Sequence, residues 1–344
     1  MNNKFYCGID VSKKKLDVVV LVDEKPKHKI FSNTNLGVKE LEEWVISQFE
    51  TNSLIHVCME ATNVYYELVA DYLSEKEKFF VSVVNPRTTN YFVKMKENSK
   101  TDKTDAKLLA MYCKQENPKR YKPKSKEIKE LKELTRLMDN LVEMLSMQKV
   151  RLQTFNTEVA ARGVLSTIKS LEDSIAETKE KIQQCYENSE KLKQQYELLK
   201  TIPSFGDRVI SVLLSELKDD DLGLYNPKKM TRYFGLEVKR TESGSSIDKK
   251  PRITKFGSAR VRCMLYMAAL VAISHNLFIA EFYNRLVSIG KPKKLALVAV
   301  MRKLLVIACA ILNSGKPFDP NYVNPKFNQN KKDNVIYYNF GKAS

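Results

Sequence analysis

The feature that most constrains the fold is an alternation of short apolar runs and helical patterns over the first 86 residues. Apolar runs of the length of a strand are found at 4–12, 15–23, 27–33, 53–62 and 79–86. Predicted helices at 36–50 and 63–76 follow the third and the fourth of these strands. Strands that alternate with helices predict a sheet covered by helices. We therefore expect an α/β domain over residues 1–124.

Four carboxylates stand where these predicted elements end or begin. Asp10 ends the first strand, Glu60 ends the fourth, and Asp102 and Asp105 open the helix after the fifth. The ends of neighbouring strands lie close together in such a sheet, and residues three apart share a helix face. Converging carboxylates are costly to bury unpaired, whereas two Mg²⁺ ions about 4 Å apart would neutralise them and could activate a phosphodiester. This layout is that of ribonuclease-H-like nucleases.

Each acid also has a plainer interpretation. Asp102 and Asp105 could simply mark the start of a helix, because helix N-termini favour acidic residues. A glycine–aspartate strand like the one that ends at Asp10 also begins actin-like sugar kinases, which bind Mg-ATP. The sequence contains no second phosphate loop or adenosine motif, so we expect no nucleotide cofactor.

Residues 125–200 differ in character from the first segment. They contain no proline, interleave charges of both signs and repeat apolar residues at three- and four-residue steps. This pattern predicts an antiparallel helical hairpin or coiled coil, with a break near Gly163. Such segments usually form arms or oligomer contacts.

Residues 201–322 are expected to form a mostly helical domain, followed by a polar, irregular tail at 323–344. Within this domain, residues 239–262 read as a polar, basic loop. The chain has a net charge of +17, and residues 201–344 hold 24 Lys and Arg against 11 Asp and Glu. A concentrated basic excess is typical of proteins that bind the phosphate backbone, although lysines also promote solubility.

A second candidate site lies in the loop TESGSSIDKK, which holds Ser243, Ser245 and Ser246. A serine hydroxyl can attack a phosphodiester, and the phosphoserine link would store the energy needed for rejoining without ATP. Cations would stabilise the transition state. The candidate nucleic-acid-binding cations are Arg240, Lys249, Lys250, Arg252, Lys255, Arg260 and Arg262. A solvated Ser/Gly turn is the plainer interpretation.

Six scattered cysteines form no CxxC pair, so neither zinc nor a disulfide framework is expected. They are predicted to be buried thiols of a reducing compartment. The N-terminal residues lack an apolar core of signal-peptide length, and the apolar run 263–274 is too short to span a bilayer. We therefore expect a cytoplasmic protein with no membrane partner.

Two sets of motifs resemble one family. The stretches YCGIDVSKKKLDV, CMEATNVYYE, VVNP and KTDKTDAKLLA resemble the RuvC-like domain of the DEDD transposases of the IS-one-ten family of bacterial insertion sequences. Downstream, LLKTIPSFG, YFGLEVKRTESGSS, ITKFGSARVRCMLYMAA, MRKLL and NSGKPFD resemble that family's C-terminal transposase domain. The resemblance runs nearly end to end, and pilin-gene invertases are close relatives. One departure is Ser204, which stands where the family often has glycine.

The resemblance implies specific residues and chemistry. It implies an acidic tetrad at Asp10, Glu60, Asp102 and Asp105 and a nucleophile at Ser243, with Ser245 and Ser246 as neighbours. It implies a bacterial transposase that excises and inserts double-stranded DNA with Mg²⁺, through a covalent serine–DNA intermediate. Family members act as homo-oligomers, as dimers and as tetramers in the synaptic complex, in which acids of one protomer work with the serine of another. At least some are guided by a structured bridge RNA.

Three alternatives stay open from the sequence. A site-specific DNA invertase would use the same chemistry. A metal-dependent RuvC-like junction nuclease would use the acids and treat Ser243 only as a turn residue. A structural nucleic-acid-binding protein would use neither.

Overall fold

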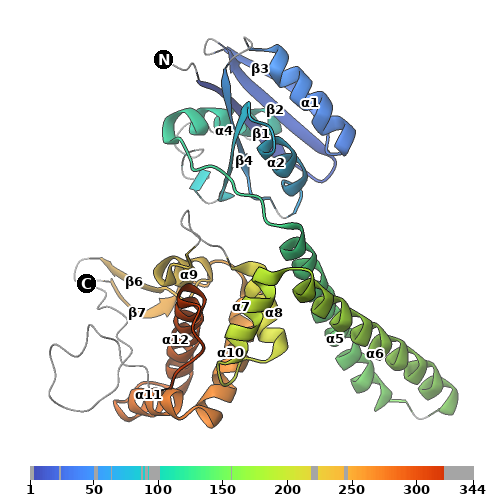
Figure 1. The fold of residues 1–344 in the computed structure, drawn as a ribbon, viewed down its shortest axis with the longest axis vertical. Coiled ribbons are helices and arrows are strands. Elements are labelled where there is room, and N and C mark those ends of the chain that lie inside the picture. Colours follow the sequence, from blue (N-terminus) through green and yellow to red (C-terminus); the bar gives the residue numbers. More distant parts are fainter. Residues whose placement is uncertain are drawn as a thin grey trace. The chain divides into compact units, whose positions relative to one another are not determined.

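The computed structural model describes residues 4–22, 25–49, 53–62, 64–86, 88–89, 92, 101–155, 157–217, 224–243 and 247–320, without the side chains of 240–251. The chain divides into two compact units, Met1–Lys124 and Ser125–Ser344 (Figure 1). The first unit ends where the sequence changes character. The finer division at 200 and 322 stays a prediction, and the tail at 323–344 lies outside the described residues.

A five-stranded mixed sheet forms the centre of the first unit. Its spatial order is β3-β2-β1-β4-β5, from β1 (Lys4–Val11), β2 (Lys15–Val22), β3 (Lys25–Ser32), β4 (Leu54–Glu60) and β5 (Phe79–Val84). Strands β1, β4 and β5 run parallel, and β2 and β3 form antiparallel pairs beside them. Each predicted strand is present, with its ends shifted by only a few residues, so the expectation of an α/β unit is confirmed.

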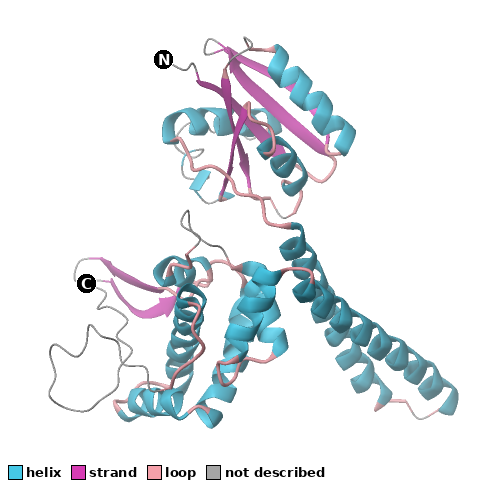
Figure 2. Cartoon of the chain, viewed as in Figure 1, coloured by secondary structure: helices cyan, strands magenta, loops and turns pink. Residues whose placement is uncertain are grey.

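Helices cover both faces of this sheet (Figures 1 and 2). Helices α1 (Asn35–Ser47) and α2 (Glu67–Ser74) bury apolar side chains such as Leu41 and Leu73 in the same core as the strands. Helix α4 (Asp102–Glu116) packs on the opposite face, with Leu109 and Cys113 in a separate cluster. These faces follow from the alternation of side chains along each strand.

Gly8 determines how closely α4 approaches the sheet. A Cβ atom at this position would lie 2.0 Å from the carbonyl oxygen of Ala106 and 2.4 Å from the backbone nitrogen of Ala110. Both atoms belong to the backbone of α4, so a larger residue could not be accommodated by turning a flexible side chain. Glycine at position 8 therefore allows α4 to lie directly on β1.

Helices α5 (Lys126–Leu152) and α6 (Glu158–Glu187) pack against each other as a helical hairpin (Figure 1). The predicted break near Gly163 is wrong, because α6 runs through this residue and the turn lies between Leu152 and Glu158. A glycine on an exposed helix face costs only about 1 kcal/mol relative to alanine, which a long helix tolerates. Whether the pair has coiled-coil packing stays a prediction.

The rest of the second unit is mostly helical, as expected. It contains α7 (Glu190–Lys200), α8 (Asp207–Glu216), α9 (Pro227–Tyr233), α10 (Ala259–His275), α11 (Leu277–Ser288) and α12 (Lys293–Ser314). Helix α12 is the most apolar of these and contributes Val300, Leu304 and Ala308 to the core. The length and composition of α12 would suit a membrane span, but 67% of its most apolar part is buried in the unit. Helices α10 and α11 would pass the same test together, as a pair bent by 98°.

A buried cation ties α12 to α11. Lys303 is only 7% exposed, and its Nζ lies 3.9 Å and 4.1 Å from the ring centroids of Phe278 and Phe282. Burial first, and Arg285 second, lower the pKa of Lys303 to about 8, against an opposing effect of Glu281. The two rings supply cation–π attraction that partly compensates for the lost hydration.

The turn between α7 and α8 carries backbone strain. Ser204 has a φ of 99°, a region that favours glycine, and its buried hydroxyl oxygen has no hydrogen-bond partner among the described residues. The departure noted in the sequence therefore falls on a position where glycine would be the unstrained residue.

Two sequence expectations for the second unit need correction. The predicted loop at 239–262 instead contains an antiparallel hairpin of β6 (Val238–Ser243) and β7 (Ile247–Ile253). Its strands are rich in charged and hydroxyl residues, which hide the usual strand pattern. Five of the six cysteines are buried as expected, but Cys263 is exposed, because the buried stripe of α10 passes through Leu265 and Ala269 instead.

The Gly8 contact makes a direct prediction. Gly8→Ala should lower the unfolding free energy by about 3 kcal/mol or more, because the overpacked Cβ meets helix backbone. The matched control is Gly163→Ala, where a Cβ meets nothing within 4 Å. That change should raise stability by up to about 1 kcal/mol through helix propensity. Denaturant unfolding measures both, and equal effects of the two substitutions would contradict this account of Gly8.

Candidate active site

Three carboxylates lie side by side across the sheet. Asp10 on β1 is directly opposite Asp17 on β2, and Glu60 on β4 follows the register of the neighbouring Ile9–Met59 pair. All three belong to the side-chain set that faces α4, because Gly8 precedes Asp10 by two residues and contacts that helix. The row therefore lies on the face that α4 covers.

Helix α4 brings two more carboxylates to this row. Asp102 and Asp105 occupy its first turn, after the N-cap Thr101, whose hydroxyl accepts a hydrogen bond from the Thr104 backbone nitrogen at 3.2 Å. Ala106, one residue beyond Asp105, is the residue whose carbonyl oxygen faces Gly8. The start of α4 is thus fixed next to β1, as the sequence predicts from the ends of these elements.

Asp10 feels the charge of all its neighbours. The pKa of Asp10 is raised to about 6, first by burial and then by the carboxylates of Asp102, Asp105, Glu60 and Asp17, in that order of effect. Like charges around a partly buried acid disfavour its ionised form. The predicted tetrad is therefore brought together closely enough to interact electrostatically.

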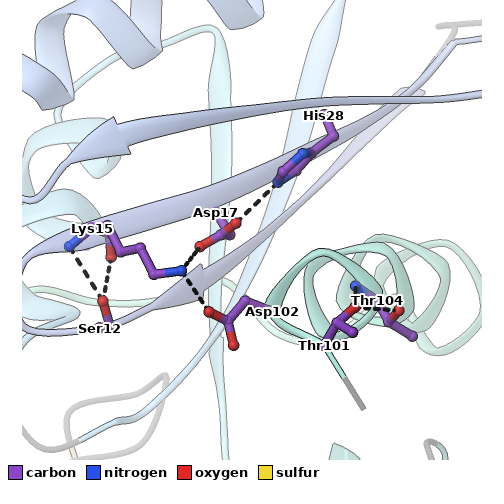
Figure 3. A network of polar contacts seen from close by, with 7 residues as sticks. All are labelled: Ser12, Lys15, Asp17, His28, Thr101, Asp102 and Thr104. Atoms are coloured by element: carbon purple, nitrogen blue, oxygen red, sulfur yellow. Dashed lines mark hydrogen bonds and ion pairs between the residues drawn. The ribbon is translucent and has the colours of Figure 1, made fainter. Parts of the chain in front are cut away.

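A lysine lies between two of the acids (Figure 3). Lys15 Nζ donates to Asp102 Oδ2 at 2.6 Å and is 3.0 Å from Asp17 Oδ2, and Asp17 Oδ1 lies 3.0 Å from His28 Nε2. Hydrogen bonds to Asp102 and then to Asp17 hold the pKa of Lys15 well above its usual range. Asp17 is only 3% exposed, so this chain of contacts provides the compensation that a buried carboxylate requires.

Glu60 has its own partner. The Thr89 hydroxyl is hydrogen-bonded to Glu60 Oε1 and lies 3.0 Å from the carbonyl oxygen of Pro86. Thr89 is 1% exposed, so its hydroxyl is held in a fixed place. This contact orients the Glu60 carboxylate.

Sequence reasoning missed Lys15, Asp17, His28 and Thr89. Asp17 had a usable signal, because a hairpin that turns between the first two strands pairs residue 10 with residue 17. Thr89 had none, since it lies beyond the predicted fifth strand and reaches Glu60 only through the tertiary fold.

The donor set suits a hard divalent cation, since its members are carboxylate oxygens that repel one another. Among the residues that the structure describes, no three His, Cys, Asp or Glu side chains form a ready ligand group. Lys15 takes one oxygen of Asp102, which is 54% exposed at its side chain. The chemistry fits a metal, and the present geometry is not that of a closed ligand shell.

The predicted serine lies at the end of a strand in the second unit. Ser243 is the last residue of β6 and is paired with Ile247 of β7. Ser245 and Ser246 lie outside the described residues, as do the side chains of Ser243, Arg240, Lys249 and Lys250. The backbone of the hairpin places positions 240, 243, 249 and 250 on one basic element.

The base of this hairpin is tightly built. Gly235 and Gly257 have φ values of 70° and 92°, and a Cβ at Gly257 would lie 1.8 Å from the carbonyl oxygen of Tyr233. Arg262 Nη1 donates to the carbonyl oxygens of Phe234 and Gly257, each at 3.1 Å. The base of the hairpin is therefore fixed to the end of α9.

The described cations around the hairpin have different surroundings. Arg252 and Lys255 are exposed, whereas the Arg260 side chain is 17% exposed and is paired with Asp139 on α5. Asp139 also accepts from Arg208 Nη2 at 2.7 Å. Arg260 thus joins α10 to α5. That Arg260 binds nucleic acid stays a prediction.

Comparison with known families agrees with this arrangement. A DEDD transposase family of IS110 type, described as "Transposase", matches residues 7–159, and "Transposase IS116/IS110/IS902 family" matches residues 196–284. The chain belongs to the IS110 family of transposases. The family resemblance stated from the sequence is confirmed, and the protein is a DNA recombination enzyme.

Two relatives cover nearly the whole IS110-family chain. The pilin gene-inverting proteins of Moraxella bovis and Moraxella lacunata are each 31% identical to it over 320 residues, which is 92% of this chain and 98% of the relative. The two family matches, at residues 7–159 and 196–284, include the acid row and the β6–β7 hairpin.

The raised pKa of Asp10 predicts a pH effect on the transposase without divalent metal. Folding raises this pKa from 3.8 to about 6, so the folded state binds the proton more tightly, and stability is lost as the pH rises through this range. The unfolding free energy of wild type minus that of Asp10→Asn should fall by about 2 kcal/mol between about pH 4 and about pH 7. Denaturant unfolding in EDTA measures it, and a difference independent of pH would contradict the proposed repulsion.

Proposed function

We propose that this IS110-family transposase exchanges DNA strands with Mg²⁺ bound at Asp10, Glu60, Asp102 and Asp105 and with Ser243 as the nucleophile. The observation that carries the proposal is the raised pKa of Asp10 among four further carboxylates. A site that concentrates negative charge in this way is unfavourable by itself and is suited to divalent cations.

The strand order of the first unit supports the acid site. An antiparallel hairpin of β1 and β2 next to parallel β1, β4 and β5 is the arrangement that we assign as ribonuclease-H-like, or RuvC-like. In this assignment the strand ends of β1 and β4 and the start of α4 carry the catalytic acids. Two bound Mg²⁺ ions would supply positive charge to the phosphate as it is attacked.

The covalent step can be written so that it balances. The Ser243 oxygen forms a bond to the phosphorus of the scissile phosphodiester, and the bond from phosphorus to the displaced sugar oxygen breaks. The serine proton leaves to a base, and the displaced oxygen gains a proton. In the second half, a sugar hydroxyl attacks the phosphoserine and restores both the phosphodiester and the free serine, so no ATP is consumed.

Partners follow from the same reasoning. We propose that double-stranded DNA is the substrate and that a structured guide RNA supplies sequence choice by base pairing, as the family resemblance implies. In agreement with this, neither a helix-turn-helix nor a zinc-finger motif stands out in the sequence. A division in which RNA reads sequence and protein reads backbone is known for RNA-guided nucleases. We propose a homo-oligomer joined partly through α5 and α6, in which the acids of one protomer meet Ser243 of another.

A site-specific DNA invertase is the second candidate. The named activity of the two Moraxella relatives favours it, and the chemistry would be the same. Flanking DNA distinguishes the two functions, because an element boundary on each side favours transposition and an invertible segment favours inversion. The cytoplasmic location also stays a prediction.

The acid site can be tested with matched substitutions. Asp105→Asn and Asp102→Asn should each lower Mg²⁺-dependent strand exchange by at least about a hundredfold, because charge stabilisation of the phosphate is lost. DNA affinity should stay close to that of the wild type. Asp173→Asn, an exposed acid on α6, is the control and should change neither quantity.

Gel assays of strand exchange and of DNA binding measure these outcomes side by side. Full strand exchange by either variant would contradict the assignment of the acids. Loss of DNA binding together with activity would mean that the acids act structurally.

A further inference from the structure

The segment that joins α4 to α5, residues 117–124, concentrates positive charge. We name it the connector; it contains Lys119, Arg120, Lys122 and Lys124, and no acid. Residues 1–124 hold 21 basic and 17 acidic residues, so the four cations of the connector equal the whole excess of the first unit. Lys119, Arg120 and Lys122 are exposed, and Lys124 is half-buried.

The first half of the connector is fixed to the edge of the sheet. Asn117 ends α4 in the left-handed region, with φ of 42°, and its backbone N–H donates to Cys113. The Ser82 hydroxyl donates to the carbonyl oxygen of Pro118 at 2.9 Å, and the Tyr121 backbone N–H donates to the carbonyl oxygen of Val81 at 2.7 Å. Ser82 and Val81 belong to β5, the edge strand of the sheet.

Tyr121 is the main anchor of the connector. Its hydroxyl donates to Asp71 Oδ1 at 3.1 Å, and its ring meets Tyr66 edge to face at 6.2 Å between centroids. Burial first, and Asp71 second, hold the pKa of Tyr121 above its usual range, so the hydroxyl remains a donor. Arg120 lies against the Phe80 ring, 5.8 Å from its centroid.

This anchoring distinguishes the connector from an ordinary flexible basic linker. Cations on a backbone that is already ordered lose less conformational freedom when they bind a ligand. The six residues 119–124 span at most about 20 Å, which is long enough for several of their cations to reach successive phosphates of one strand. A row of cations at this spacing suits a phosphate backbone and reads no base sequence.

We propose that the connector is a nucleic-acid-binding track that contacts the phosphodiester backbone through these four cations. The proposal rests on the proposed function only for the class of partner. Backbone chemistry is shared by duplex DNA and structured RNA, so the test includes both.

The test compares the salt dependence of binding for the full-length protein in EDTA, where no strand is cut. One variant carries Lys119→Gln, Arg120→Gln, Lys122→Gln and Lys124→Gln. A charge-preserving variant carries Lys119→Arg, Arg120→Lys, Lys122→Arg and Lys124→Arg. The matched control carries Lys169→Gln, Lys179→Gln, Lys181→Gln and Lys193→Gln, at exposed positions of α6 and α7, and the probes are a random-sequence duplex DNA and a structured RNA of equal length.

Each lost phosphate contact should reduce the slope of log affinity against log salt by about 0.9 for duplex DNA, or about 0.7 for a single strand. The connector variant should therefore lose about 2 to 4 units of slope on one probe or both. The charge-preserving variant and the matched control should keep the wild-type slope. The probe with the larger loss identifies the nucleic acid that lies on the connector.

The proposal would be overturned if the connector variant kept the wild-type slope on both probes. It would also be overturned if the matched control lost as much slope as the connector variant. If the affinity of the wild-type protein did not change with salt concentration, both the proposed role of the connector and the proposed nucleic-acid partner would be contradicted. Failure of the serine chemistry alone would not alter this assay, because it measures binding without metal.

Discussion

The contact between α4 and β1 at Gly8 is the constraint on which the acid site depends. Of the four acids proposed to bind metal, Asp10 and Glu60 lie on the sheet and Asp102 and Asp105 lie on α4, so the site exists only if the helix lies against the strand. Glycine at position 8 permits backbone to meet backbone there, and the hydrogen-bonded start of α4 at Thr101 then fixes Asp102 and Asp105 relative to Asp10. A side chain at position 8 would move the two halves of the site apart.

The carboxylates of this site lie close enough together to repel one another. Asp10 and Asp17 are direct cross-strand neighbours, an arrangement of like charges that destabilises a sheet. Lys15 and His28 compensate on one side and Thr89 orients Glu60 on the other, but Asp10 itself keeps a raised pKa. This retained repulsion lowers stability and supports the proposal that divalent cations bind at these acids.

Much of this arrangement could be predicted from the sequence, for physical reasons. The strands are apolar runs ended by polar residues, and Asp10, Glu60, Asp102 and Asp105 stand at the ends of elements, where topology alone brings them together. Asp17 was missed because it lies inside a strand, and the β6–β7 hairpin because its strands are polar. The close approach of α4 to Gly8 could not be predicted, because the packing distance between two elements depends on the tertiary fold and not on the local sequence of either element.

The second unit supplies the other half of the proposed chemistry. Its hairpin base is fixed by Gly257 and Arg262, so the strand that ends at Ser243 extends from a rigid support. Rigid support is what a nucleophile needs, since misplacement by about 1 Å can cost about a hundredfold in rate. The basic hairpin and the acid row are each built by their own unit.

The measurement that tests the central claim most directly is covalent trapping. The protein is incubated with Mg²⁺, RNA from the non-coding ends of the element and labelled element-end DNA, and the products are separated on a denaturing protein gel beside Ser243→Ala. The account predicts a labelled protein band that disappears in Ser243→Ala. Cleaved DNA without such a band, or a band that persists in Ser243→Ala, would contradict it.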